Sequence, residues 1–155
     1  MLQITAVVHT LNDGMRLGRC LETVYPCDEI LVIDHGSIDD TQLVAREYGA
    51  KLVNAGTETS VQHWIAEGWM LCLDARESLT EALSASLYEL KSEHFPAHVS
   101  GYAALLREET AGGWIEHAAQ TRLVPANWQR WQDRLPTHDP SAVVLLGEIL
   151  RFTLP

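Results

Sequence analysis

The stretch that decides the fold is Glu29-Ile30-Leu31-Val32-Ile33-Asp34, which leads into the polar turn His35-Gly36-Ser37-Ile38-Asp39-Asp40. Its central residues are apolar without alternation, a pattern typical of a strand that is buried on both faces of a parallel sheet. The runs at 4–8 and 69–74 have the same character, and 51–54 is a shorter example. The first half of the chain therefore predicts several buried strands.

Helical patterns separate these strands. Apolar residues recur at helical spacing over 17–24, behind Asn12 and Asp13, either of which can cap the helix. A second helix is expected over 41–48, and a third behind Ser78-Leu79-Thr80-Glu81, which matches the capping-box pattern. Strands alternating with helices predict an α/β protein, a three-layer α/β/α sandwich around a mostly parallel central sheet.

The texture of the sequence changes near Pro96, but no linker interrupts the chain. Apolar runs at 101–106, 142–146 and 149–154 predict further strands of the same sheet. Three tryptophans in this half, Trp114, Trp128 and Trp131, form either part of the core or an exposed apolar surface. We therefore expect a single domain over 1–155, with a change of character between 1–95 and 96–155.

Composition excludes several classes of partner. The formal net charge of −10 argues against nucleic-acid binding and against docking on an anionic membrane. Cys20, Cys27 and Cys72 show no repeated spacing, as expected of reduced, buried thiols. The start of the sequence lacks the basic region of a signal peptide, and no apolar stretch reaches the ~20 residues of a membrane span. A cytoplasmic protein without a transmembrane segment is expected.

Polar clusters follow three of the predicted strands. Thr10, Asn12 and Asp13 follow the first strand, residues 34–40 the second, and 74–77 the fourth. Ligands of open parallel sheets bind beyond the carboxyl ends of the strands, so the three clusters should converge on one binding edge. The alternative is that Asn12, Ser37, Asp39 and Asp40 only cap helices.

The motifs at these positions resemble those of family-2 glycosyltransferases. Residues 7–13 (VVHTLND) are similar to the opening V-V-I-P-T-Y-N-E run of that family, and 28–41 (DEILVIDHGSIDDT) to its D-E-I-V-V-V-D-S-G-S-T-D-x-T segment. Residues 71–77 (LCLDARE) resemble L-x-L-D-A-D-E, which contains the D-x-D metal motif. Weaker similarity at 113–123 and 138–139 points to the subgroup that includes lipopolysaccharide-core glycosyltransferases.

This resemblance implies a nucleotide-diphospho-sugar transferase-like fold and transfer of sugar from a nucleotide-sugar donor to a glycan or lipid-linked acceptor. It implies a nucleotide-binding half over 1–95 and a truncated acceptor-side half over 96–155. The implied donor-binding residues are Thr10, Asn12, Asp13, Asp34, Ser37, Asp39, Asp74 and Arg76. The implied acceptor-side residues are His117, Arg122 and His138, with Asp139, or Glu116 behind it, as general base.

The metal motif departs from the family pattern, because Arg76 stands where the second acid is expected. Mg²⁺ and Mn²⁺ need oxygen ligands, and arginine has only donors, so any metal would depend on Asp74 and be weakened by Arg76. Two interpretations remain: Arg76 binds the diphosphate in place of the cation, or it pairs with an acid of a retired site. The alternative function is a non-catalytic module of the same fold that binds a partner or forms a homo-oligomer through the tryptophan-rich half.

Overall fold

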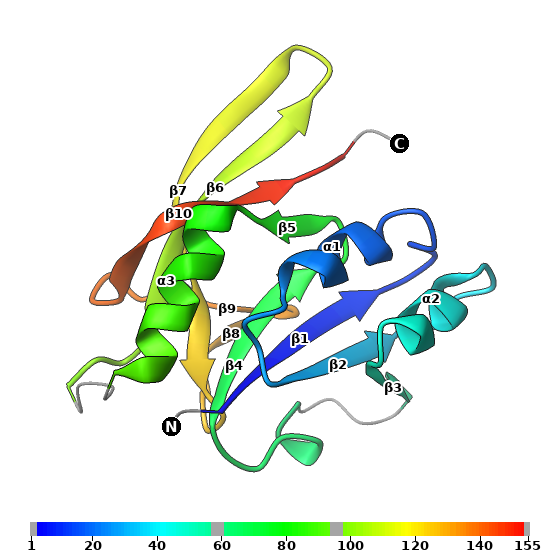
Figure 1. Ribbon diagram of the computed structural model, residues 1–155, viewed down its shortest axis with the longest axis horizontal. Helices are drawn as coiled ribbons and strands as arrows, with labels where there is room; N and C mark the ends of the chain where they lie inside the picture. Colours follow the sequence, from blue (N-terminus) through cyan, green and yellow to red (C-terminus); the bar gives the residue numbers. More distant parts are fainter. Residues whose placement is uncertain (1–2, 57–60, 94–97, 154–155) are drawn as a thin grey trace.

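The computed structural model describes residues 3–56, 61–93 and 98–153 of the chain (Figure 1). The elements in chain order are β1 (Ile4–Thr10), α1 (Leu17–Thr23), β2 (Glu29–Asp34), α2 (Thr41–Glu47), β3 (Lys51–Asn54), the 3₁₀ turn η1 (Val61–His63), β4 (Trp69–Asp74), β5 (Glu77–Leu79), α3 (Glu81–Ser92), β6 (Tyr102–Thr110), β7 (Gly113–Pro125), β8 (Trp131–Gln132), β9 (Leu135–Pro136) and β10 (Val143–Arg151).

One sheet contains eight strands in the order β3-β2-β1-β4-β7-β6-β10-β5. Strands β3, β2, β1 and β4 are mutually parallel, and β10 is parallel to β6. Strand β7 runs antiparallel to both β4 and β6, and β5 runs antiparallel to β10. The prediction of an α/β protein with a mostly parallel central sheet is confirmed.

The two faces of the sheet are covered differently. Helices α1, α2 and α3 lie on one face, where Leu17, Ala45 and Leu87 are buried in a single cluster with the side chains of the sheet. The opposite face is covered by η1 and the small β8–β9 hairpin, and Trp128 is buried in its cluster. Apolar side chains on both faces bury the centres of β1, β2 and β4, as their unbroken aliphatic runs predict, whereas the edge strand β3 is half-buried.

Helix starts differ from the expected caps. Helix α1 begins at Leu17 without a side-chain cap, because Asn12 and Asp13 belong to a longer loop before it. Helix α3 is capped by Thr80, whose Oγ1 accepts from the Leu83 amide, so the expected cap residue Ser78 lies in β5 instead. Thr80 Oγ1 also accepts from the Glu148 amide at 2.9 Å and thereby joins the helix start to β10.

The two C-terminal runs form one strand. Residues expected as separate strands at 142–146 and 149–154 make up β10, which continues through Gly147 with a positive φ of 102°. A Cβ at Gly147 would lie 2.1 Å from the Leu83 amide nitrogen, so only glycine lets α3 approach the strand this closely. Leu154 lies outside the described residues.

The two halves of the chain share one sheet, because β4 pairs with β7 across the middle of it. The predicted change of character at residues 95 and 96 lies outside the described residues. Within the described ranges, none of the helices is both long and apolar enough to cross a membrane.

Candidate functional site

The carboxyl ends of the first four strands meet at one edge. Thr10, at the end of β1, is the register partner of Asp34 in β2, which in turn is the partner of Asn54 in β3. On the other side of β1, His9 is the partner of Asp74 in β4. The predicted convergence of polar strand ends is therefore present, and the loops that follow β1, β2 and β4 surround this edge.

Reciprocal hydrogen bonds join the loops after β1 and β2. The Asn12 side-chain oxygen accepts from the Ile38 amide at 2.9 Å, and the Asn12 amide donates to Ser37 Oγ at 2.8 Å. The Asp13 amide donates to Thr41 Oγ1 at 2.9 Å. Asn12 adopts a left-handed φ of 55°, a conformation that asparagine tolerates better than most residues.

Asp39 forms a further bridge between the same loops. Its Oδ2 accepts from the Gly14 amide at 3.1 Å, and its Oδ1 accepts from the amide and hydroxyl of Thr41. Asn12, Ser37 and Asp39 therefore join the two loops. Asp39 also accepts from the first amide of α2, as a helix cap would, whereas Asp40 at the N-cap position makes no side-chain cap hydrogen bond. We call these two hydrogen-bonded loops the rim.

Asp34 is fully buried at the base of the rim. Its carboxylate accepts from the amide and hydroxyl of Ser37 and from the Gln42 side chain at 2.7 Å. Beside it, buried Thr10 donates its hydroxyl to Asp13 Oδ2 at 2.9 Å. These three donors fix the direction of the Asp34 carboxylate at the end of β2.

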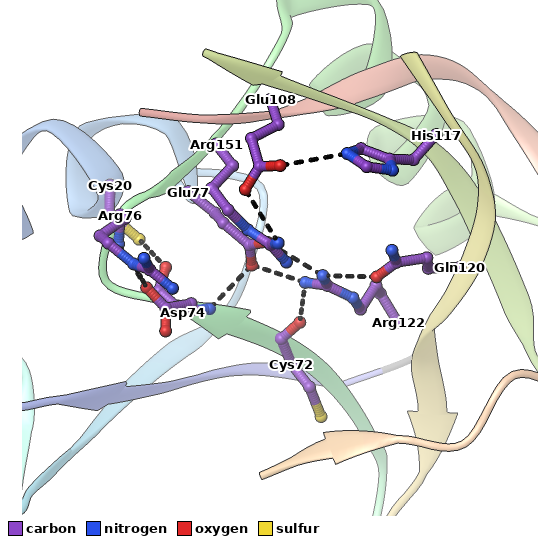
Figure 2. Close-up of polar contacts among 10 residues, drawn as sticks. All are labelled: Cys20, Cys72, Asp74, Arg76, Glu77, Glu108, His117, Gln120, Arg122 and Arg151. Atoms are coloured by element: carbon purple, nitrogen blue, oxygen red, sulfur yellow. Dashed lines mark hydrogen bonds and ion pairs between the residues drawn. The ribbon is translucent and has the colours of Figure 1, made fainter. Parts of the chain in front are cut away.

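Asp74 and Arg76 form an ion pair in the loop after β4. Asp74 Oδ1 accepts from both the backbone amide and Nε of Arg76, each at 2.9 Å (Figure 2). Burial alone would raise the pKa of Asp74, but the hydrogen bonds and charge of Arg76 hold it below its ordinary value. The hydrogen bond with Asp74 in turn raises the pKa of Arg76.

Glu77 lies at the centre of a buried charge network behind this loop (Figure 2). Arg122 donates to both of its oxygens, at 2.6 and 2.9 Å, and Arg151 donates from Nε and Nη2 at 3.1 and 2.9 Å. The Asp74 amide donates to Glu77 Oε1 at 2.8 Å. Burial acts to raise the pKa of Glu77, but the charge of Arg122 outweighs it and keeps the carboxylate ionised.

The donor set at the metal motif does not fit a divalent cation. Asp74 contributes one carboxylate, and two donors of Arg76 already share one of its oxygens. Within residues 3–56, 61–93 and 98–153, no three or more His, Cys, Asp or Glu side chains are grouped so that they could hold a metal ion. Mn²⁺ and Mg²⁺ prefer several oxygen ligands, so the residues present do not form their usual site.

A histidine pair lies at the same edge of the sheet. His9 Nδ1 and His35 Nε2 are 2.9 Å apart, which requires that one nitrogen donates and the other accepts. Burial, together with the charges of His35 and Arg134, lowers the pKa of His9 to about 4, and burial also lowers the pKa of His35. Both rings are therefore neutral at pH 7, and neither histidine is among the predicted site residues.

The acceptor-side candidates are placed apart from Asp74. Asp139 is buried and accepts from Ser100, Ser141 and Arg130, each within 2.9 Å. The hydrogen bonds from Ser141, with those from Arg130 and Ser100, lower its pKa far below the usual range. These hydrogen bonds anchor Asp139 in its loop, and its expected role as general base stays a prediction.

The neighbouring candidates also have structural partners. His138 Nδ1 lies 3.0 Å from Thr121 Oγ1, and His117 Nε2 lies 3.2 Å from Glu108 Oε1. Glu116 is exposed and, as the residue before His117 in β7, points to the opposite face of the sheet. No contact among the described residues joins His138 or Glu116 to Asp74.

Arg122 departs most from its expected role as a ligand contact. Its side chain is 2% exposed, and its donors are occupied by Glu77, Gln120 and the Cys72 carbonyl. A bulge explains this placement: Tyr102 pairs with Leu123 and Ala103 with Thr121, so Arg122 is left without a partner in the ladder. The arginine therefore supports the loop of Asp74 from behind and is not free to touch a ligand.

Several known proteins are similar to this chain in sequence. An uncharacterized glycosyltransferase of Rickettsia felis is 29% identical over 101 residues, which is 61% of this chain and 36% of the relative. The lipopolysaccharide core biosynthesis glycosyltransferase LpsC of Rhizobium meliloti is 29% identical over 104 residues. A TPR repeat-containing protein of Synechococcus elongatus is 30% identical over 131 residues, 79% of this chain and 32% of that protein. No protein-family model matches the sequence.

Solved structures with the same architecture include glucosyl-3-phosphoglycerate synthase from Mycobacterium tuberculosis in complex with Mn²⁺ and UDP-glucose. The TM-score is 0.50 at 21% identity, over 68% of this chain and 44% of that one. A second complex of that enzyme, with Mn²⁺, UDP and product, gives a TM-score of 0.51 at 19% identity. The chain thus has a GT-A nucleotide-sugar transferase fold and glycosyltransferases among its relatives, and it spans about a third of the length of the relatives that it matches.

Proposed function

We propose that this chain binds a nucleotide-sugar donor at the carboxyl edge of β1, β2 and β4, as the donor-binding part of a family-2 glycosyltransferase. The observation that carries the proposal is the cross-linked rim, in which Asn12, Ser37 and Asp39 join two loops above the buried carboxylate of Asp34. The glycosyltransferases among the sequence relatives and the UDP-glucose complex with a similar fold support it.

The proposed roles follow from position. The hydrogen-bonded loops after β1 and β2, with Thr10, Asn12 and Asp13, border the nucleotide, and Asp34 orients the side chains that meet its base or ribose. Asp74 and Arg76, at the end of β4, face the sugar diphosphate. The resemblance to lipopolysaccharide-core enzymes makes a glycan or lipid-linked acceptor, and a cytoplasmic setting that keeps the three thiols reduced, part of the same proposal.

Calorimetric titration of the purified protein with UDP-glucose and GDP-mannose tests the proposal. Saturable heat is expected for at least one of them, and Asp34→Asn should abolish it. Asp28→Asn is the matched control, because Asp28 precedes β2 at the opposite edge of the sheet and accepts from the Ile4 amide. No heat with any nucleotide sugar, in Mn²⁺ or in EDTA, would overturn the proposal.

A second candidate function is self-association, and a specific surface favours it. Leu105, Val144 and Leu146 are 46%, 52% and 81% exposed. Leu105 lies between Ala104 and Leu106, which both pack on the helix side, so it faces the other side of the sheet. Val144 lies in β10, which pairs with β6 beside Leu105, and exposed apolar patches commonly mark protein interfaces.

We propose a second copy of this chain as the occupant of this surface. Among the tryptophans, exposed Trp114 can extend it, whereas Trp128 is part of the core. Sedimentation velocity should show a dimer that Leu146→Lys converts to monomer. A wild-type protein that stays monomeric over the accessible concentration range would contradict this candidate.

A further inference from the structure

The resemblance and the Mn²⁺ complexes of proteins with this fold lead to the expectation of a cation at the loop after β4. The residues of this chain do not fit one, as the carboxylate of Asp74 is shared by two donors of Arg76. The expected metal site and the observed Asp74–Arg76 pair have the same net charge. Two carboxylates and a divalent cation sum to zero charge, and Asp74 with Arg76 also sums to zero, without any metal.

The geometry holds the guanidinium of Arg76 in a defined position. Its Nε and its own backbone amide both donate to one oxygen of Asp74, so the planar group is fixed along that edge. In the part of the chain that the structure describes, no acceptor contacts its two Nη groups, and its side chain is 39% exposed. The open edge of the fork therefore carries donors that match the oxygens of a phosphate.

Hydrogen bonds from other elements anchor the loop that carries Arg76. Glu77, at the next position, is fixed by Arg122 and Arg151 and accepts from the Asp74 amide. The Arg76 carbonyl accepts from the Phe152 amide at 2.9 Å, which ties the loop to the residue after β10. Both ends of the loop are thus anchored, and its charged pair cannot easily rearrange to admit a cation.

We infer that the site binds a nucleoside diphosphate without a divalent cation, with the open edge of the Arg76 guanidinium donating hydrogen bonds to the diphosphate where the D-x-D motif of the family that this chain resembles holds its metal. This inference rests on the proposed function, since it concerns the same donor. It makes a distinct claim, because a nucleotide site that requires Mn²⁺ would satisfy the proposed function and contradict the inference.

The test measures the affinity of UDP, GDP and the matching nucleosides by calorimetry, in EDTA and in Mn²⁺. We expect the diphosphate to bind equally well in both. Arg76→Ala should weaken diphosphate binding in EDTA by about ten- to a hundredfold, the worth of hydrogen bonds to a charged group, and leave nucleoside binding unchanged. The diphosphate affinity of Arg76→Lys should lie between those of the wild type and Arg76→Ala. Arg46→Ala, a substitution at an exposed position on α2, should leave the affinity unchanged.

Replacing Arg76 with aspartate, which restores the second acid of the D-x-D motif, gives the sharpest test. Arg76→Asp should make diphosphate binding dependent on Mn²⁺, because it creates the paired carboxylates that the cation needs. Wild-type binding that occurs only in Mn²⁺ would overturn the inference and leave the proposed function standing, as would unchanged affinity of Arg76→Ala in EDTA. If no nucleoside or diphosphate binds in EDTA or in Mn²⁺, the inference and the proposed function are both contradicted. Circular dichroism of each variant establishes that it is folded.

Discussion

Replacing Arg122 with methionine should destabilise the protein more than any other single arginine substitution considered. The change keeps much of the apolar volume but removes two hydrogen bonds to Glu77, one to Gln120 and one to the Cys72 carbonyl. Removing one partner of a buried ion pair costs about 3–5 kcal/mol, because the other charge is left without its counterion. Arg151 and the Asp74 amide remain on Glu77, which favours the lower end, about 3 kcal/mol.

Thermal and urea unfolding followed by circular dichroism measure this loss. A domain of this length loses about 2–4 °C in Tm per kcal/mol, so Arg122→Met should unfold about 6–12 °C below the wild type. Arg46→Met is the control, since an exposed substitution on α2 should stay within about 0.5 kcal/mol. The double variant Glu77→Gln with Arg122→Met should lose less than the sum of the single changes, because no unpaired buried charge remains.

The pH dependence gives an independent check. The folded pKa of Glu77 lies below its ordinary value, so the stability that it contributes is present above pH 4.5 and is lost as the pH falls through the folded pKa. Glu77→Gln should therefore reduce the loss of stability in acid. A loss of less than about 1 kcal/mol in Arg122→Met would refute the view that this pair anchors the loop after β4.

Three further changes test local features. Gly147→Ala should lower the free energy of unfolding in urea by about 3 kcal/mol or more, because the new Cβ would collide with α3. Gly113→Ala, at a similar φ but in open space, should cost only about 1–2 kcal/mol. Equal losses would mean that packing at Gly147 is loose. Thr80→Ala should cost about 1–2 kcal/mol by thermal unfolding and Thr80→Ser almost nothing, since the hydroxyl accepts from two amides; a loss in serine as large as in alanine would exclude the cap as the cause. Because the pKa of His9 falls from 6.5 to about 4 on folding, the unfolded chain takes up a proton first, and stability should decline as pH falls between these values. His9→Asn should flatten that decline in Tm, and an unchanged pH profile would contradict it.

Much of the first half of the fold follows from local patterns. The strand at Glu29–Asp34 and the helix that ends before Gly49 lie where the apolar run and the glycine predict them. Gly49 has a φ of 73°, the left-handed conformation that ends a helix. These elements are specified by residues close together in sequence, and so their pattern is visible without the structure.

The second half of the fold is less visible in the local sequence pattern. Strand β7 spans Gly113–Pro125 with exposed and buried residues in irregular order, because its bulges break the alternation that marks a strand. Helix α3 was expected to start from Ser78, but that residue is drawn into β5 by pairing with β10, some seventy positions later. A partner that distant leaves no trace in the local pattern.

The site was predictable in position and not in its contacts. Convergence of Thr10, Asp34 and Asp74 follows from parallel topology alone. The roles of Glu77 and Arg151 could not be inferred, because their side chains meet only through the order of β5 and β10 in the sheet. The pairing of Arg76 with Asp74 was one of two open interpretations, and the contact itself is compatible with both, since a guanidinium held by Nε can still bind a phosphate through Nη.

The position of β5 at the edge of the sheet governs the order in which the protein can be completed. Strand β5 pairs with β10, although the two are separated by all of α3, β6 and β7 along the chain. A ribosome that has synthesised the first eighty residues has made both loops of the rim, but Glu77 then has no sheet partner and neither of its arginines. Contacts so distant in sequence form slowly and close late in folding. The contacts that anchor the loop of Asp74 and Arg76 through Glu77 are thus complete only once Arg151 has been synthesised.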